Sequence, residues 1–187
     1  RPSLSVVKEA RGGPLDGTLG EYALVREEGL VAAPEHLSDV EAGTLTCAAV
    51  TAWMAMVETA ELRPGDTVLL QGTGGVSTFA LQFAQILGLR TIVTSSSDDK
   101  LAKAVELGAD HTINYVQEPK WGRAAKKLTG GRGVDLVVEV GGAGTVNQSL
   151  AAIAIGGQIA MIGVLAGAVT DFNVVRVFMA GAKMQGI

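Results

Sequence analysis

Two glycines and a serine form the first pattern in this sequence that has a chemical meaning. In the segment QGTGGVS, Gly72 and Gly74 take the first two places of a G-x-G-x-x-G turn, and Ser77 takes the third. The first glycine permits a sharp turn, and the second lets the backbone approach a pyrophosphate closely. Ser77 is small enough to keep a helix near a strand, and its hydroxyl can bond a carbonyl or a phosphate oxygen. The pattern predicts a dinucleotide-binding turn.

The segments on either side of the turn are those that such a site requires. TVLLQ at residues 67–71 is a short apolar run, and from Gly75 onward apolar residues recur at helical spacing. The N-terminus of that helix would present unpaired N–H groups and the positive end of its dipole to an anion. The alternative is a glycine-rich turn that only links strand to helix. The strand before the turn and the helix after it favour the binding site.

The end of the next predicted strand bears on the choice between NAD and NADP. NAD-binding chains carry an acidic residue there, about twenty residues after the first glycine, for the ribose 2′-hydroxyl. This sequence has hydroxyl side chains at residues 94–97, with Asp98 and Asp99 only in the next predicted helix and Lys100 behind them. Hydroxyls and an ammonium group accept a 2′-phosphate that a carboxylate would repel, so the segment favours NADP(H) over NAD(H). The same serines and aspartates also suit a helix cap, and the two roles are compatible.

Strands and helices alternate along the rest of the chain. The predicted strands are nearly continuous apolar runs, which indicates that helices cover both of their faces. The pattern predicts an α/β fold, a doubly wound six-stranded parallel sheet of the Rossmann type. The predicted strands are residues 67–71, 91–94, 111–115, 134–140, 158–165 and 183–187. The predicted helices are residues 38–60, 75–87, 98–108, 121–128, 145–153 and 172–180.

Composition narrows the class of protein. A net charge of -4 gives no reason to expect nucleic acid or an anionic membrane as a partner. Cys47 is the only cysteine, which excludes a disulfide within the chain and fits a cytoplasmic protein. No uninterrupted run of about 18 apolar residues appears, so no membrane span is expected. The sequence does not begin with Met and ends inside a predicted strand, which indicates a fragment of a longer protein.

Several long motifs together resemble one enzyme superfamily. LRPGDTVLLQGTGGVSTFALQFA, TSSSDDKLAKAVELGADHTINY and TGGRGVDLVVEVGGAGT resemble the medium-chain dehydrogenase/reductase superfamily, in particular its alcohol dehydrogenase and quinone oxidoreductase-like members. The resemblance extends from about Gly17 onward. It implies that residues 38–187 are the dinucleotide-binding domain. It also implies that residues 1–37 are the end of a GroES-like catalytic domain and a linker, with GEYALV and GLVAAP as its last strands.

The resemblance also implies roles for individual residues toward the cofactor. The pyrophosphate would lie on Gly72, Thr73, Gly74, Gly75 and Val76. The 2′-phosphate would be bound by Ser95, Ser96, Lys100 and Tyr115, although Tyr115 can equally be a half-buried surface aromatic.

Two further glycine-containing segments would complete the site. Gly141 and Gly142 would lie beside the adenosine, and Gly163, Val164 and Leu165 would border the nicotinamide ribose. All of these positions follow predicted strands, where ligands bind in such sheets. The alternative for Gly141 and Gly142 is an ordinary strand exit.

Metal and acid–base residues are less well indicated. Cys47 matches the place where zinc-using relatives carry their third catalytic ligand, but a cysteine in an apolar helix is more often a small buried hydrophobe. The buried interpretation is favoured, so use of zinc stays open. His36 and His111 read as structural, and Glu139 is a lone carboxylate in an apolar strand. No catalytic residue is assigned.

These observations predict an NADP(H)-dependent oxidoreductase that transfers hydride between nicotinamide and a small-molecule alcohol or carbonyl, quinone or enone. A non-catalytic nucleotide-binding relative is the first alternative. A methyltransferase on a similar sheet is the second, and the missing acid after the second strand speaks against it. We also expect a homodimer, because residues 183–187 form an edge strand that invites pairing, unless a further C-terminal segment covers that edge.

Overall fold

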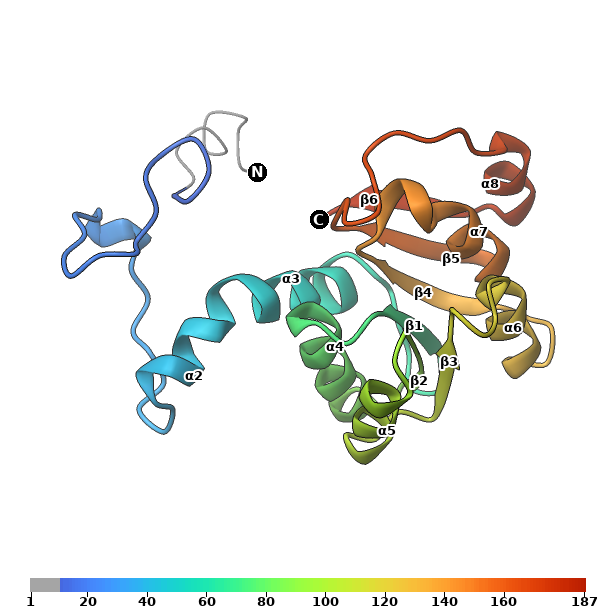
Figure 1. Ribbon diagram of the computed structural model, residues 1–187, viewed down its shortest axis with the longest axis horizontal. Helices are drawn as coiled ribbons and strands as arrows, with labels where there is room; N and C mark the ends of the chain where they lie inside the picture. The colour runs from blue at the N-terminus through green and yellow to red at the C-terminus, as the bar shows by residue number, and fades with distance from the viewer. Residues whose placement is uncertain (1–10) are drawn as a thin grey trace. The chain divides into compact units, whose positions relative to one another are not determined.

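The computed structural model describes residues 11–187, and the chain divides into two compact units, Arg1–Asp39 and Val40–Ile187 (Figure 1). The second unit holds one six-stranded sheet in which every neighbouring pair of strands is parallel. The strand order is β3-β2-β1-β4-β5-β6, which is the order of the dinucleotide-binding fold. The predicted fold class is therefore confirmed. The strands are β1 Thr67–Gln71, β2 Arg90–Ser95, β3 His111–Asn114, β4 Val134–Glu139, β5 Ile153–Met161 and β6 Lys183–Gly186.

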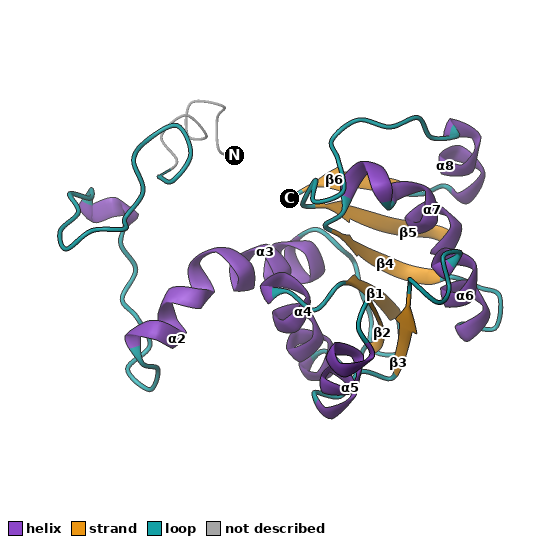
Figure 2. Cartoon of the chain, in the orientation of Figure 1, coloured by secondary structure: helices purple, strands orange, loops and turns teal. Residues whose placement is uncertain are grey.

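Helices cover the sheet on both faces (Figure 2). Side chains alternate along β1. Val68 and Leu70 join the core cluster under α4 (Gly75–Ile86) and α5 (Asp98–Glu106), while Leu69 joins the cluster under α6 (Trp121–Leu128) and α7 (Val146–Ala152). This period-two alternation explains why the strands read as continuous apolar runs, since both of their faces are buried. The helices that follow the strands are these four and α8 Val174–Ala180.

A long helical run precedes the sheet, as the sequence predicts. It comprises α2 Asp39–Thr44, the π-helical turns Leu45–Ala49 and Met54–Glu58, and α3 Val50–Trp53 between them. Among the described residues, this run is long and apolar enough by length and composition to cross a membrane, with a mean hydropathy of 1.4. This test considers length and composition only, so the expectation that the chain has no membrane span stays a prediction. Helices packed in soluble proteins pass the same test, so it identifies no membrane protein.

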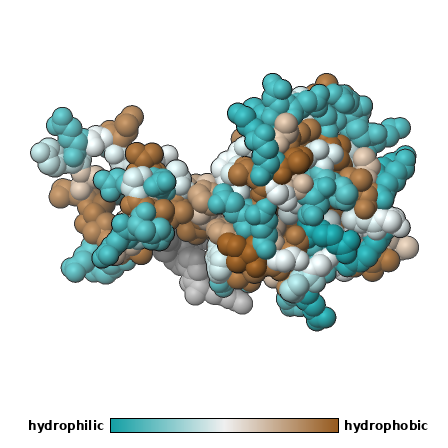
Figure 3. All heavy atoms as spheres, turned by 90° about the horizontal axis from the view of Figure 1, so that it is seen from below, coloured by the Kyte–Doolittle hydropathy of each residue, from teal (hydrophilic) through white to brown (hydrophobic). Residues whose placement is uncertain are grey.

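Two segments expected to be strands are not strands. Residues 20–25 and 29–34 contain only a short 3₁₀ helix, Glu27–Gly29, and their apolar residues Tyr22, Leu24 and Val31 are exposed. A strand needs a neighbouring backbone for its hydrogen bonds, and no segment of residues 11–39 pairs with these two. Without a partner strand, these apolar side chains stay exposed, and hydrophobic residues, in brown, are visible on the surface of the molecule (Figure 3). That residues 1–37 end a GroES-like domain stays a prediction.

Strand β5 begins earlier and ends earlier than predicted. Its pairing with β4 shifts register between Val134 and Leu136. Gly156 has a φ of 76°, a backbone conformation that glycine adopts without strain. This irregularity lets the chain join the sheet directly after α7. Residues 162–165, expected to belong to the strand, lie in the loop that follows it.

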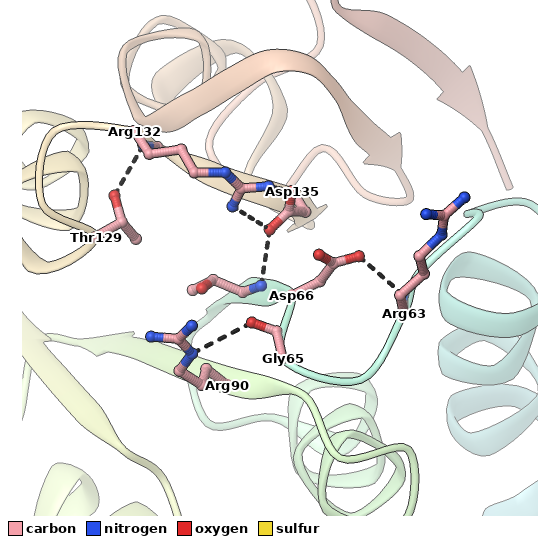
Figure 4. A network of polar contacts seen from close by, with 9 residues as sticks. Arg63, Gly65, Asp66, Arg90, Thr129, Arg132 and Asp135 are labelled. Carbon is pink, nitrogen blue, oxygen red and sulfur yellow. Dashed lines mark hydrogen bonds and ion pairs between the residues drawn. The ribbon is translucent and has the colours of Figure 1, made fainter.

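Two carboxylates cap the amino-terminal ends of neighbouring strands. Asp135 of β4 accepts the backbone N–H of Thr67, the first residue of β1, at 2.8 Å, and it also binds the guanidinium of Arg132 (Figure 4). Asp110 in the same way accepts the N–H of Thr91 in β2 at 2.7 Å. The Asp135 carboxylate raises the pKa of Arg132 by hydrogen bonding first and by charge second. These bonds satisfy amides that would otherwise be left over where a parallel strand begins.

Changing Asp135 to Asn should destabilise the fold without touching the opposite edge of the sheet. An amide oxygen can still accept one bond, but the ionic partner of Arg132 is lost. We expect urea unfolding of Asp135→Asn to show a loss of about 1–3 kcal/mol. The matched control is Glu106→Gln, the same chemical change on an exposed side chain of α5, which should stay within about 0.5 kcal/mol of the wild type. Equal stability of both variants would contradict the role of Asp135.

Candidate cofactor site

A cleft of about 750 Å³ opens at the carboxyl-terminal edge of the sheet. It brings together the turn after β1, Thr94 near the end of β2, and segments that follow β3, β4 and β5. This is the edge at which ligands bind in doubly wound sheets. The predicted residues on its wall are Gly72, Gly74, Gly75, Val76, Tyr115, Gly141 and Leu165.

The glycine turn has the geometry that the sequence predicts. Strand β1 ends at Gln71, Gly72 turns the chain with a φ of 73°, and α4 begins at Gly75. Gly74 is the N-cap residue of α4, with an ordinary φ of −79° and no side chain to cap the helix. A Cβ atom added to Gly74 would meet no protein atom within 4 Å. The fold itself therefore does not require glycine at this position. A pyrophosphate that approaches the backbone closely does require it, because a side chain would occupy the same space.

Ser77 takes the first of the two roles open to its hydroxyl. It is buried, and its Oγ donates to the carbonyl oxygen of Gln71 at 2.7 Å. The serine thus binds the start of α4 to the end of β1, which is the close packing that a third glycine would allow. The N–H groups of the first turn of α4 have no partners within the helix and are directed to its open end. The turn fits the phosphates of a dinucleotide.

The residues expected to hold a 2′-phosphate are divided by the structure. Ser97 is the N-cap of α5 and its hydroxyl accepts the N–H of Lys100, so the capping role is confirmed. Ser95 is buried and accepts the N–H of Ser97, and Ser96 is exposed beside it. Tyr115 lines the large cleft. The Lys100 side chain instead lines an adjoining hollow of about 230 Å³ between α4 and α5, which shares Gly72 with the large cleft and also includes Thr73.

Asp98 lies near these residues but is engaged elsewhere. One of its carboxylate oxygens accepts Asn114 Nδ2 at 2.7 Å, and the other accepts Gln117 Nε2 at 3.0 Å. Both amides come from β3 and the turn after it. The carboxylate is therefore directed to β3 and to the turn that follows it.

The loops after β4 and β5 are hydrogen-bonded to each other. Ala166 N–H donates to the Gly141 oxygen at 2.7 Å, and Ala143 N–H donates to the Gly167 oxygen at 2.8 Å. A Cβ atom on Gly142 would lie 2.5 Å from the Gly167 oxygen, and one on Gly163 would lie 2.5 Å from the oxygen of Val140. These glycines permit the close approach of the two loops. Gly142 and Gly163 are thus required by packing, while Gly141 and Leu165 reach the cleft and the Val164 side chain is exposed.

The sequence patterns did not identify a buried polar pair, Gln71 and Glu139, as part of the site. Gln71 and Glu139 occupy the last positions of β1 and β4, and Gln71 Nε2 donates to the Glu139 carboxylate at 2.7 Å. The signal in the sequence is a polar residue that closes each of two apolar strands. Its meaning depends on β1 and β4 being neighbours, which the strand order alone decides.

Comparison with known proteins agrees with this geometry. The family model described as "Zinc-binding dehydrogenase" matches residues 75–187. The chain belongs to this family. It is a member of the medium-chain dehydrogenase/reductase superfamily that covers the cofactor domain. The match to a dehydrogenase family argues against the methyltransferase alternative.

The chain spans about half the length of the relatives that it matches. It is 48% identical, over its whole length, to 56% of a zinc-type alcohol dehydrogenase-like protein of Schizosaccharomyces pombe. An NAD-dependent alcohol dehydrogenase structure matches 92% of this chain and 50% of its own, with 38% identity and a TM-score of 0.84. The quinone oxidoreductase of Thermus thermophilus, solved also with NADPH, matches 93% of this chain and 55% of its own, with 33% identity and a TM-score of 0.78.

The family's name mentions zinc, and Cys47 is the candidate zinc ligand that the sequence offers. Cys47 is exposed, so the interpretation as a buried hydrophobe is wrong. It lies on the π-helical turn Leu45–Ala49, a face that the described residues leave uncovered. No three His, Cys, Asp or Glu side chains of residues 11–187 come together to hold a metal. A catalytic zinc site, which needs about three protein ligands, would therefore need ligands from outside this segment.

Proposed function

We propose that this chain is the NADP(H)-binding part of an oxidoreductase that transfers hydride between nicotinamide and an alcohol or carbonyl, a quinone or an enone. The observation that carries the proposal is Gly74, a glycine whose φ and surroundings would accept a side chain. Its missing side chain leaves the open end of α4 accessible to a pyrophosphate. The nicotinamide, when bound, supplies or accepts the hydride. The residues of this chain bind and orient the dinucleotide.

The preference for NADP(H) is supported by charge at the end of β2. Asp98 has both carboxylate oxygens bonded to amides of the β3 side, and Lys100 and Lys103 line the hollow beside the glycine turn. Ammonium groups attract a 2′-phosphate, and β2 ends in the hydroxyl residues Thr94 and Ser95 where NAD-binding chains carry a carboxylate. The relatives include a protein solved with NADPH and one named NAD-dependent, so the family as a whole does not decide the choice.

The other parts of the proposal concern the whole protein. We propose a small-molecule substrate, with the substrate pocket and the proton donor completed by segments outside residues 11–187. Neither nucleic acid nor a membrane is proposed as a partner. Strand β6 lies at the edge of the sheet and is paired on one side by β5, which supports a homodimer formed through that edge. A cytoplasmic location stays a prediction.

Separate titrations with NADPH and NADH test the proposal. Fluorescence of the reduced nicotinamide or the heat of binding should show NADPH bound at least about tenfold more tightly, a difference of roughly 1.4 kcal/mol. Tighter binding of NADH would overturn the NADP(H) preference and leave the dinucleotide site in place. Binding of neither nucleotide to the folded protein would overturn the site itself.

Turnover separates the enzyme from a non-catalytic nucleotide-binding relative. The full-length protein should oxidise NADPH with at least one substrate among a panel of aldehydes, quinones and enones. Tight NADPH binding without oxidation across all three classes would favour the non-catalytic relative.

A further inference from the structure

The most completely buried charge at this edge of the sheet belongs to Glu139, the last residue of β4. Its side chain is 0% exposed. Burying a carboxylate costs several kcal/mol unless its oxygens are well hydrogen-bonded. Five neutral donors serve it: Gln71 Nε2 at 2.7 Å, the N–H groups of Gly141 at 2.9 Å and Gly142 at 3.0 Å, and the hydroxyls of Thr145 and Ser149.

The donors of Glu139 belong to the segments that surround the cleft. Gly141 and Gly142 form the exit from β4, and Thr145 and Ser149 lie at the start of α7 and within it. The carboxylate therefore gathers the exit of β4 and the first turns of α7 around one point. Because it accepts two successive N–H groups of the exit, it holds that backbone in the turn where Gly142 has a φ of 76°.

Gln71 extends the network to the glycine turn. Its Oε1 accepts the N–H of Val140 at 3.1 Å and of Gly141 at 3.2 Å, while its Nε2 donates to Glu139. Gln71 directly precedes Gly72, and its own carbonyl accepts the Ser77 hydroxyl. The turn after β1 and the exit of β4 are therefore tied by side chains as well as by the sheet.

The network also reaches the loop after β5. Gly141 accepts the Ala166 N–H, and Ala143 donates to the Gly167 carbonyl, so the β5 loop rests on the backbone that Glu139 holds. Gly141, Thr145 and Ala166 all line the large cleft. The turn after β1, the exit of β4 and the loop after β5 are thus all linked, directly or through one further residue, to one buried carboxylate.

We propose that Glu139 is a positioning residue for the dinucleotide. Since it is fully buried, it does not contact the cofactor itself. It holds residues 140–145 open beside the glycine turn, so that the cofactor finds the cleft already formed. The inference rests on the proposed function.

A purely structural role is the rival explanation, and the same strand offers a matched control. Asp135 lies at the opposite end of β4, and it also accepts a backbone N–H from outside its own strand. Changing either carboxylate to its amide removes one buried or half-buried charge. Only Glu139 lies at the edge that carries the cleft, so only its replacement should change cofactor binding beyond the loss of stability.

The test compares Glu139→Gln with Asp135→Asn in the full chain. Kd for NADPH is measured at a temperature where urea unfolding shows both variants to be folded. Glu139→Gln should raise Kd by at least about tenfold and Asp135→Asn by less than about twofold. Amide hydrogen exchange without nucleotide should be faster at residues 141–144 in the first variant and unchanged there in the second.

Exchanging the two polar groups gives a rescue variant. Glu139→Gln combined with Gln71→Glu keeps one carboxylate and one amide in contact, and it should recover part of the lost affinity. If Glu139→Gln does not fold, Ser149→Ala and Thr145→Val each remove one donor, and each should raise Kd by about threefold.

Three results would overturn the inference. These are an unchanged Kd in Glu139→Gln, an equal rise of Kd in the Asp135→Asn control, or, if Glu139→Gln does not fold, an unchanged Kd in both single-donor variants. Failure of the wild type to bind either nucleotide is a different outcome, because it would overturn the proposed function together with the inference.

Discussion

Replacing Gly74 with aspartate should abolish dinucleotide binding while leaving the stability of the fold nearly unchanged. The position has an ordinary φ and open space where a side chain would begin, so the protein itself does not resist the change. An aspartate at a helix N-cap even favours the helix, because its carboxylate accepts N–H groups of the first turn. Those are the groups that a pyrophosphate would use, and the added negative charge would repel it. We expect the Kd for NADPH to rise at least about a hundredfold, or roughly 2.7 kcal/mol.

Calorimetric titration and urea unfolding of the same preparation check this expectation. Gly43→Asp is the matched control: Gly43 also has open space around a Cβ atom, and it lies in α2, away from the lining of the cleft. Its Kd should equal that of the wild type. Gly72→Ala provides the contrast, because a φ of 73° costs an alanine about 1–2 kcal/mol of stability. Unaltered NADPH binding by Gly74→Asp would show that the turn only connects strand to helix.

Replacing Lys100 with glutamate should reverse the choice of nucleotide. The side chain lines the hollow beside the glycine turn, and its exposed charge is free to meet a 2′-phosphate. A hydrogen bond to a charged group contributes about 1.5–3 kcal/mol, so its loss and the new repulsion should weaken NADPH by at least about thirtyfold. NADH lacks the phosphate and should bind within about threefold of the wild type.

The fold should tolerate this substitution. Only the backbone N–H of Lys100 takes part in the cap with Ser97, and a glutamate in the first turn of α5 agrees with the helix dipole. Lys127→Glu, an equal charge reversal on an exposed residue of α6, should change neither affinity. Titrations of both nucleotides against both variants decide the matter. Equal weakening of NADPH and NADH by Lys100→Glu would place Lys100 outside any 2′-phosphate site.

The local patterns of the sequence predicted most of the sheet and the geometry of the glycine turn after β1. TVLLQ is apolar on both faces and became the buried strand β1, and the helical spacing after Gly75 became α4. The spacing of Gly72 and Gly74 identified the turn because its requirements are local: a positive φ at one residue and no side chain at the other. Ser97 capped α5 for the same reason, since a cap and its N–H partner lie within one turn.

The predictions that failed concern features that depend on contacts with distant parts of the chain. GEYALV and GLVAAP have strand-like composition, but a strand exists only beside a partner, and residues 11–39 provide none. Cys47 lies in an apolar helix and is nevertheless exposed, because burial depends on what covers a helix and not on the helix itself. The grouping of Ser95, Ser96, Lys100 and Tyr115 around a 2′-phosphate came from a resemblance and stays a prediction; the structure places Lys100 and Tyr115 in adjoining hollows that share Gly72.

The sequence by itself determined the succession of strands and helices along the chain, the class of the fold and the glycine turn. Each of these follows from patterns among residues a few positions apart. The tertiary structure alone decided the partners of Glu139. Its contact with Gln71 joins residues 68 positions apart, and it forms because β1 and β4 are neighbours whose carboxyl-terminal ends coincide. A carboxylate that looked isolated along the chain thus lies at the centre of the candidate site. No periodicity in one strand can specify which side chain stands at the end of the next.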